Sequence, residues 1–141
     1  NSTIAIRGTS QNNTSTVHIV TYNLTIVSPA FTFWIVNDGL TIAPGTWGNV
    51  TVQVNNTGPV ASNVTLNATG RQPLFVDALL VTDGQNSTGP LNLTVPGQGN
   101  STFYVEVYVS PTATAGLKTI FVESLYHGVE LQTLGIRINV S

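Results

Sequence analysis

The sequence predicts an all-β sandwich, and three observations support this fold class. Short segments in which apolar and polar residues alternate recur along the 141-residue chain, as they do in strands with one buried face. Clusters of Gly, Pro, Asn and Ser separate these segments, which is typical of the turns between strands. No segment has the spacing of apolar residues that marks an amphipathic helix. The length fits a single domain.

Ten strands are expected from this pattern. Their ranges are about 2–7, 17–27, 31–36, 48–55, 62–68, 73–82, 90–95, 101–110, 117–126 and 129–140. The segment 101–110 is the clearest, because every second position is apolar and points inward: Phe103, Val105, Val107 and Val109. In the last segment the apolar positions change phase near Thr133, and a β-bulge at that point is expected to restore the register.

The first sixteen residues are expected to be distinct from the sandwich, which is assigned to 17–141. Ile4 and Ile6 share one face of a short alternating strand, and a polar connector follows at 8–16. Because a sheet edge exposes unpaired main-chain groups, such a strand is suited to pair with another chain. Ile4 and Ile6 are therefore the expected donor-strand residues. The alternative is a mobile terminal arm.

Asparagine is the most informative residue type in the chain. Twelve of the fourteen asparagines open an Asn-x-Ser/Thr triplet, whereas the Ser and Thr content predicts about three by chance. This triplet is the acceptor for N-glycosylation, which requires a surface position outside the cytoplasm. Only Asn37 and Asn56 lack the triplet. The expected glycosylation sites are Asn12, Asn23, Asn49, Asn55, Asn63, Asn67, Asn86, Asn92 and Asn100.

Strand alternation gives these acceptors outward positions. Six acceptors lie on the polar face of their segments, opposite the inward-pointing apolar residues, and a glycan can be accommodated there: Asn23, Asn49, Asn63, Asn67, Asn92 and Asn139. Asn12 and Asn13 overlap in one connector, so at most one of them is expected to be heavily modified. Asn1 and Asn139 lie near the chain ends and are less certain acceptors. The alternative is that a Thr- and Asn-rich β protein contains these triplets by accident.

The composition indicates an exterior setting. Charged residues make up 7% of the chain, against about 25% in an ordinary soluble domain. The net charge is −2 and the mean hydropathy is +0.21, a combination that favours association unless something else confers solubility. Attached glycans would do so. Since few groups titrate, stability is expected to depend weakly on pH.

Two residue types that the chain lacks, cysteine and methionine, bear on how the protein is processed and where it is located. There is no cysteine, so disulfides do not stabilise the fold. There is no methionine, so we expect residue 1 to follow a removed signal peptide. The apolar runs are too short to span a bilayer. We therefore expect the mature chain at the cell surface or in the medium, without membrane insertion.

Residue patterns for catalysis are lacking, and we expect no enzyme, no cofactor and no metal. His18 and His127 have no ligand partners at metal-binding spacing. The four basic residues are dispersed, which gives no stripe for nucleic acid. Trp34 and Trp47 are expected to be core or groove aromatics, with carbohydrate stacking by Trp47 as the alternative.

Two stretches resemble a known kind of module. Residues 50–58 with 61–66, and residues 95–98 with 101–111 and 115–120, resemble the two halves of immunoglobulin-like modules of the CARDB and NPCBM-associated type. The resemblance covers about 40–126 and implies an immunoglobulin-like β-sandwich. Such modules serve as spacers, stalks and adhesive or filament-forming units and share no catalytic residues.

The whole layout has a second resemblance. A sandwich that is crowded with acceptors, lacks cysteine, is poor in charge and carries an extra N-terminal strand resembles the subunit of archaeal thread filaments. That resemblance implies a cell-surface homopolymer, joined head to tail by donor strands and heavily N-glycosylated. The alternative function is a surface-layer stalk or adhesin module that binds a partner or glycan.

Overall fold

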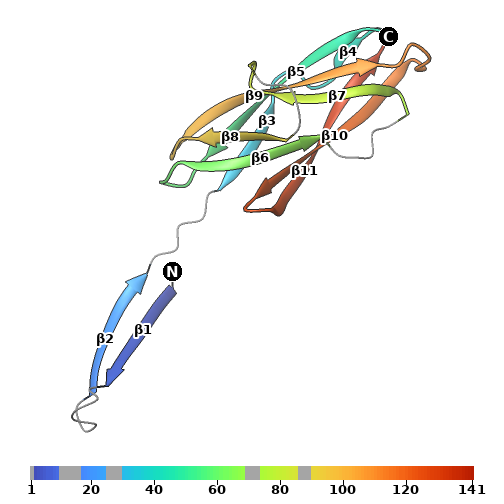
Figure 1. Ribbon diagram of the computed structural model, residues 1–141. Coiled ribbons are helices and arrows are strands. Elements are labelled where there is room, and N and C mark those ends of the chain that lie inside the picture. Colours follow the sequence, from blue (N-terminus) through green and yellow to red (C-terminus); the bar gives the residue numbers. More distant parts are fainter. Residues whose placement is uncertain (1, 10–16, 25–29, 69–73, 86–89) are drawn as a thin grey trace.

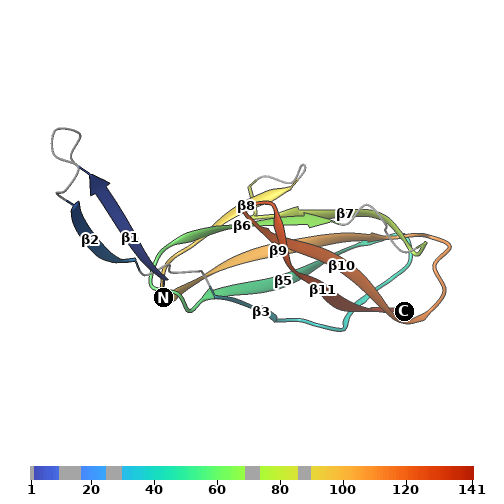
Figure 2. The same ribbon diagram turned by 90° about the horizontal axis from the view of Figure 1, so that it is seen from below.

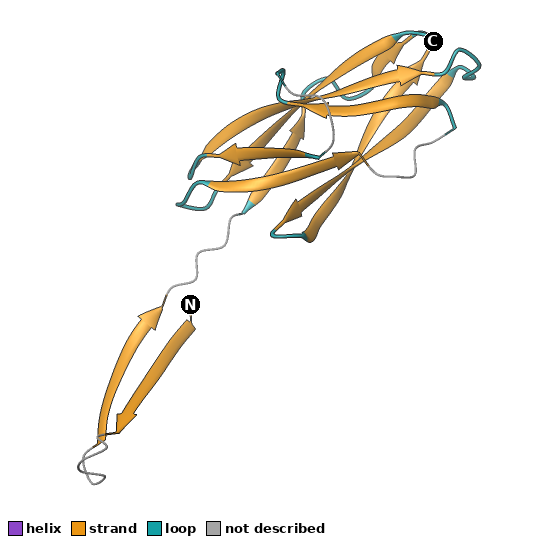
Figure 3. Ribbon diagram, in the orientation of Figure 1, coloured by secondary structure: helices purple, strands orange, loops and turns teal. Residues whose placement is uncertain are grey.

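The computed structural model describes residues 2–9, 17–24, 30–68, 74–85 and 90–141, and in this part every regular element is a strand (Figure 3). Two sheets pack face to face (Figures 1 and 2). The five-stranded sheet has the order β4 (Leu40–Ile42), β11 (Val129–Val140), β10 (Gly116–Tyr126), β6 (Ser62–Ala68), β8 (Leu91–Val95). The four-stranded sheet has the order β3 (Phe31–Ile35), β5 (Trp47–Asn56), β9 (Gly99–Val109), β7 (Val76–Thr82).

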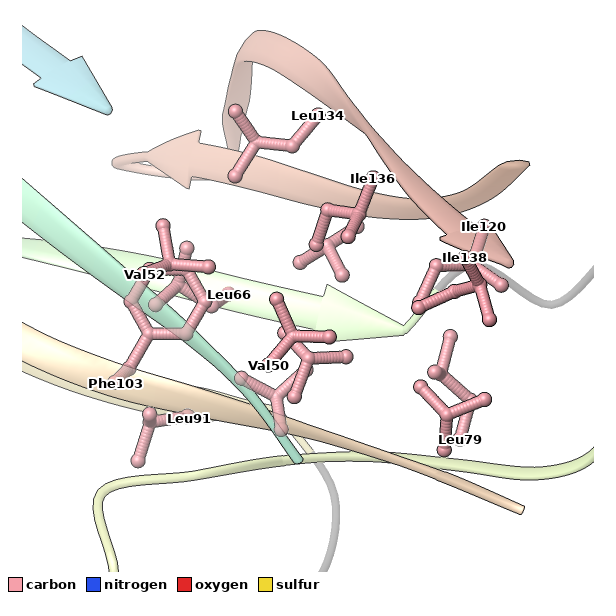
Figure 4. Close-up of a cluster of buried hydrophobic side chains, with 14 of the residues drawn as sticks. Val50, Val52, Leu66, Leu79, Leu91, Phe103, Ile120, Leu134, Ile136 and Ile138 are labelled. Atoms are coloured by element: carbon pink, nitrogen blue, oxygen red, sulfur yellow. The ribbon is translucent and has the colours of Figure 1, made fainter. Parts of the chain in front are cut away.

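The core lies between these two sheets. Each long strand alternates buried and less buried positions, so its apolar residues meet those of the facing sheet. Val50 and Val52 of β5 and Phe103 of β9 are fully buried on one side, and Leu66 and Ile136 are fully buried on the other (Figure 4). The inward set expected in 101–110 is confirmed, since Phe103, Val105, Val107 and Val109 are all buried.

One strand, β4, is not among those expected from the sequence, and it lies where the chain changes sheets. β3 pairs antiparallel with β5, and three residues of β4 then pair parallel with the end of β11 in the other sheet. Alternation cannot mark a strand this short. Its position is fixed instead by the preceding turn, Asn37-Asp38-Gly39, in which Gly39 has φ +82°, a conformation that favours glycine.

Neighbouring side chains of that turn fasten it to opposite sheets. Asn37 Oδ1 accepts a hydrogen bond from the Thr51 N–H in β5 at 2.8 Å. Asp38 accepts hydrogen bonds from Arg137 in β11, from the main-chain N–H at 2.8 Å and from Nε at 2.7 Å. The hydrogen bond from the Arg137 side chain holds the pKa of Asp38 below its usual value.

The expected phase change in the last strand is present as a bulge. The register between β10 and β11 shifts between Ser124 and Leu125, so that Leu131 has no partner. Buried Ser124 repairs the ladder there, since its hydroxyl donates to the Gln132 carbonyl at 2.8 Å and accepts from the Gln132 N–H. Leu131 and Val129 are consequently exposed, although the sequence pattern placed them on a buried face.

The N-terminal strands form a separate hairpin. β1 (Ser2–Thr9) pairs antiparallel with β2 (Val17–Leu24) in a two-stranded sheet and joins neither sheet of the sandwich. In both views the hairpin lies beyond one end of the sandwich (Figures 1 and 2). Residues 17–24, which the sequence assigns to the sandwich, pair with β1 in this hairpin. Alternation identifies a strand but does not say which strand it pairs with.

Candidate functional site

The acceptor asparagines of the sandwich lie on its outer faces. Asn49, Asn63, Asn92 and Asn100 are exposed, and Asn55, Asn67 and Asn139 are half-buried. They are distributed over both sheets, on β5, β6, β8, β9 and β11. Asn23 lies in β2, where the backbone alone is described. Asn1, Asn12, Asn13 and Asn86 lie outside the described residues.

The amide nitrogen is the atom that N-glycosylation modifies, so its hydrogen bonding matters. Among the acceptors of the described sandwich, Asn139 alone uses Nδ2 in a hydrogen bond, to Thr41 Oγ1 at 3.2 Å. Asn63 and Asn92 bond through Oδ1 as acceptors and leave Nδ2 free. The nitrogen that would receive the sugar is thus free at most of the acceptors that the structure describes.

Conversely, the two asparagines without a triplet are structural. Asn37 donates from Nδ2 to the Asn49 carbonyl at 3.1 Å while its Oδ1 accepts from Thr51. Asn56 is 1% exposed; it donates to the Val60 carbonyl at 2.8 Å and accepts from the Gly58 N–H at 2.9 Å. Absence of the triplet was the signal in the sequence that separated these residues from the acceptors.

Acceptor triplets face each other between β6 and β8. The register places Asn63 opposite Thr94 and Thr65 opposite Asn92. Each threonine hydroxyl donates to the opposite asparagine Oδ1 at 2.7 Å. Each triplet therefore orients the amide of the other triplet, with its nitrogen turned away from the bond.

Two acceptor asparagines are directly opposed between β5 and β9, where Asn55 lies opposite Asn100 in the register. Side chains of such a pair have Cβ atoms about 4.5–5.5 Å apart. Two bulky groups at this spacing would collide. Neither segment alone predicts this opposition, since the two residues are far apart along the chain.

Both tryptophans are exposed, so neither is a core residue, although Trp47 borders an open cavity on the surface. Trp34 is 65% exposed on β3 and Trp47 is 54% exposed on β5. The Trp47 ring packs against Tyr108 of β9, with ring centroids 5.3 Å apart. This aromatic pair lies on the outer face of the four-stranded sheet, beside Asn49.

One edge of β11 is partly open. Its last three residues pair with β4, whereas 129–136 has no strand partner on that side among the described residues. The N–H and carbonyl of Arg137 point toward Asp38 and Gly39. Since main-chain groups alternate in direction along a strand, those of Thr133 and Gly135 point to the same open side.

The expected donor residues lie on β1 at defined register positions. Ile4 is opposite Tyr22 and Ile6 is opposite Val20. Opposed residues of an antiparallel pair share one face, so this face of the hairpin carries apolar residues from both strands. In β1 and β2 the structure describes the backbone alone.

Among the described residues, no group of three or more His, Cys, Asp or Glu side chains lies close enough together to hold a metal ion. No helix in the described part is long and apolar enough to cross a membrane. The described residues therefore present acceptor amides, exposed aromatics and an open strand edge as their distinctive surface features.

No protein-family model matches the chain, and no curated protein matches it in sequence. Solved structures do share its fold. The CARDB domain of a Pyrococcus furiosus protein, solved in complex with di-metal ions, superposes with a TM-score of 0.51 at 12% identity, covering 85% of this chain and 95% of that one. This likeness establishes an immunoglobulin-like β-sandwich.

Two further similar structures are more distant. Domains 4 and 5 of the S-layer protein SbsC match with a TM-score of 0.48 and 20% identity over 89% of this chain, which spans 58% of that chain. The PapD-like domain 7 of human CEP192 matches with a TM-score of 0.40 and 15% identity, covering 77% of this chain and 83% of that one.

Proposed function

We propose that this protein is the structural subunit of an extracellular surface filament. Each subunit donates β1 to the next subunit, and N-linked glycans cover the outer faces of both sheets. The observation that carries the proposal is that the β1–β2 hairpin belongs to neither sheet of the sandwich.

A hairpin of this kind needs a further partner. A two-stranded antiparallel sheet is at best marginally stable alone in water. One face of the hairpin has four aliphatic or aromatic residues in its middle, with Leu24 opposite Ser2 at one end and Gly8 opposite His18 at the other: Ile4, Ile6, Val20 and Tyr22. Burial of one such aliphatic side chain contributes about 1.5–3 kcal/mol, so transfer of β1 with Ile4 and Ile6 into a neighbouring chain is favourable.

The donated strand is received by the open edge of β11 in the neighbouring subunit. β1 is eight residues long, which matches the length of the unpaired stretch 129–136. Phe31 and Phe33 of β3 are partly buried against the core on the facing sheet. A strand added to β11 would pack its isoleucines over these rings. By transferring from β2 to β11 of a neighbour, β1 exchanges one set of ladder hydrogen bonds for another, as in a domain swap.

Donor and acceptor lie on different surfaces of the chain, so the contact between subunits is heterologous. A heterologous contact that does not close into a ring gives an open filament. Glycans on both outer faces would keep neighbouring filaments apart and replace the charge that the chain lacks. Attachment of these glycans requires a location outside the cytoplasm.

Deletion of residues 1–8 tests the proposal. The truncated protein is expected to fold and to remain monomeric by size-exclusion chromatography and electron microscopy. Ile4→Ser with Ile6→Ser should have the same effect, whereas the matched control Thr3→Ser with Ala5→Ser, on the other face, should still polymerise. Filaments from the truncated protein would refute donation, and a full-length protein that stays monomeric would favour a stalk or adhesin module.

A further inference from the structure

Trp47 lies exposed at the start of β5, in register opposite Tyr108 of β9. Their rings are inclined at 51° and form one apolar surface on the outer face of the sheet. Exposed tryptophan is costly in a protein that needs solubility, and an aromatic surface beside polar groups marks a binding site. The exposed Trp47–Tyr108 pair is therefore a candidate binding surface.

The acceptor Asn49 lies two residues after Trp47 in the same strand. Residues two apart in a strand share a face, so Trp47 and the glycan acceptor project side by side. An open cavity of about 290 Å³ is lined by Trp47, Asn49 and Glu106, together with Gly48 and Leu80. The acceptor amide is thus part of the wall of the cavity that the aromatic ring borders.

Among the acceptors of the described sandwich, Asn49 alone has an aromatic residue two positions earlier in its own strand. The residues two positions before the others are all non-aromatic: Gln53, Ala61, Thr65, Pro90, Gln98 and Arg137. Asn49 is also exposed and its side chain makes no hydrogen bond in the structure. Its amide is free to carry a group that turns back toward Trp47.

We propose that the Trp47–Tyr108 pair is the seat for the first sugar of a glycan on Asn49. A pyranose ring has an apolar face of C–H groups that packs on an indole ring, while its polar groups remain at the rim. Glu106, opposite Asn49 in the register, supplies a carboxylate that accepts a hydrogen bond from a sugar hydroxyl or acetamido N–H. The glycan then covers aromatic surface that the fold leaves open.

The proposal rests on the glycosylation included in the proposed function. In the attachment step the Asn49 Nδ2 forms a bond to C1 of a phosphate-activated sugar, the C1–O bond to the phosphate breaks, and the amide loses one proton. No oxidant or reductant is involved. The attached sugar is then held against the rings of Trp47 and Tyr108.

The first measurement is the occupancy of Asn49, by intact-glycopeptide mass spectrometry on protein from its own host. Thermal unfolding of four glycosylated proteins then forms a cycle: the unchanged chain, Asn49→Gln, Trp47→Leu, and the double variant. Loss of the glycan is expected to lower the unfolding midpoint by about 2–5 °C when Trp47 is present and by much less when Trp47→Leu is also present. Asn92→Gln, with Pro90 two residues earlier, is the matched control, and its effect should be the same with and without Trp47→Leu.

A spectroscopic readout separates stacking from a general effect of the glycan. In the background Trp34→Phe, the fluorescence of Trp47 should shift to shorter wavelength when Asn49 carries its glycan, and should not shift with the glycan on Asn92. An unoccupied Asn49 overturns the proposal by removing the glycan itself. If Asn49 is fully glycosylated and loss of its glycan lowers the unfolding midpoint equally with Trp47 and with Trp47→Leu, the sugar does not stack on Trp47. That result overturns the stacking and leaves the proposals of glycosylation and filament assembly unaffected.

Discussion

Removal of the Asn56 side chain should cost far more stability than removal of its neighbour Asn55. Asn56 is buried and joins two turns at one end of the sandwich. Its Nδ2 donates to the Val60 carbonyl at 2.8 Å and to the Val95 carbonyl at 3.4 Å, and its Oδ1 accepts from the buried Gly58 N–H at 2.9 Å. In Asn56→Ala all three main-chain groups lose this partner.

The magnitude follows from which of these groups can reach water. Val60 is exposed, so its carbonyl can bond to solvent. The Gly58 N–H and the Val95 carbonyl belong to buried residues, and each group left unsatisfied costs about 1–3 kcal/mol. Since the bond to Val95 is long, we expect a total of about 2–4 kcal/mol, which corresponds to a fall in unfolding midpoint of roughly 8–16 °C for a domain of this size.

The assay is thermal and denaturant unfolding of unglycosylated protein, so that loss of a glycan does not enter the comparison. Asn55→Ala is the control, because the Asn55 side chain is half-buried and makes no hydrogen bond in the structure; its cost should stay near 0.5 kcal/mol. Equal losses in the two variants would refute the assignment of Asn56 as the structural asparagine and Asn55 as the acceptor.

Three other predictions follow from the close contacts, the ion pair and the opposed acceptors. Gly97→Ala should destabilise the fold by about 1–3 kcal/mol, because the added Cβ would lie 2.4 Å from the Pro59 carbonyl oxygen; Gly135→Ala, which meets ordinary contact at 3.4 Å, is the control in the same unfolding assay. Because Arg137 lowers the pKa of Asp38 in the folded state, the stabilisation by this pair is complete above the ordinary carboxyl pKa and is lost as pH falls through the lowered one. Asp38→Asn should therefore flatten the acid limb of stability against pH, and an unchanged limb would contradict it. Finally, Asn55 and Asn100 should not both be fully glycosylated, so that Asn55→Gln raises the occupancy of Asn100 in glycopeptide mass spectrometry; two saturated sites would disprove the collision.

Alternation along single strands could be read from the sequence, and features that depend on pairing between strands could not. The inward set of β9 follows from local periodicity alone, because burial of one face imposes it. The placement of β4 depends instead on hydrogen bonds from Asn37 and Asp38 to opposite sheets. Likewise, the alternation in β2 fits a sandwich strand equally well, and its pairing with β1 is seen only in the structure.

The candidate sites divide in the same way. Outward positions of acceptors such as Asn49 follow from the period of two, and the lack of a triplet separates Asn56 from the acceptors, whereas its structural role is seen only in its hydrogen bonds. The juxtaposition of Trp47 with Tyr108 and of Asn55 with Asn100 depends on the register between β5 and β9. Pairing over that distance leaves no trace in either segment alone.

Complementation between two assembly-defective variants tests the central claim most directly. Deletion of 1–8 gives a subunit that accepts a strand and cannot donate one. Thr133→Pro gives the converse, because proline removes an N–H from the open side of β11 and leaves the bonds of Gln132 toward β10 in place. Each variant alone should be monomeric in sedimentation velocity, and their mixture should give a single 1:1 heterodimer that grows no further. Filaments in the mixture, or two monomers that never associate, would contradict donation of β1 to β11.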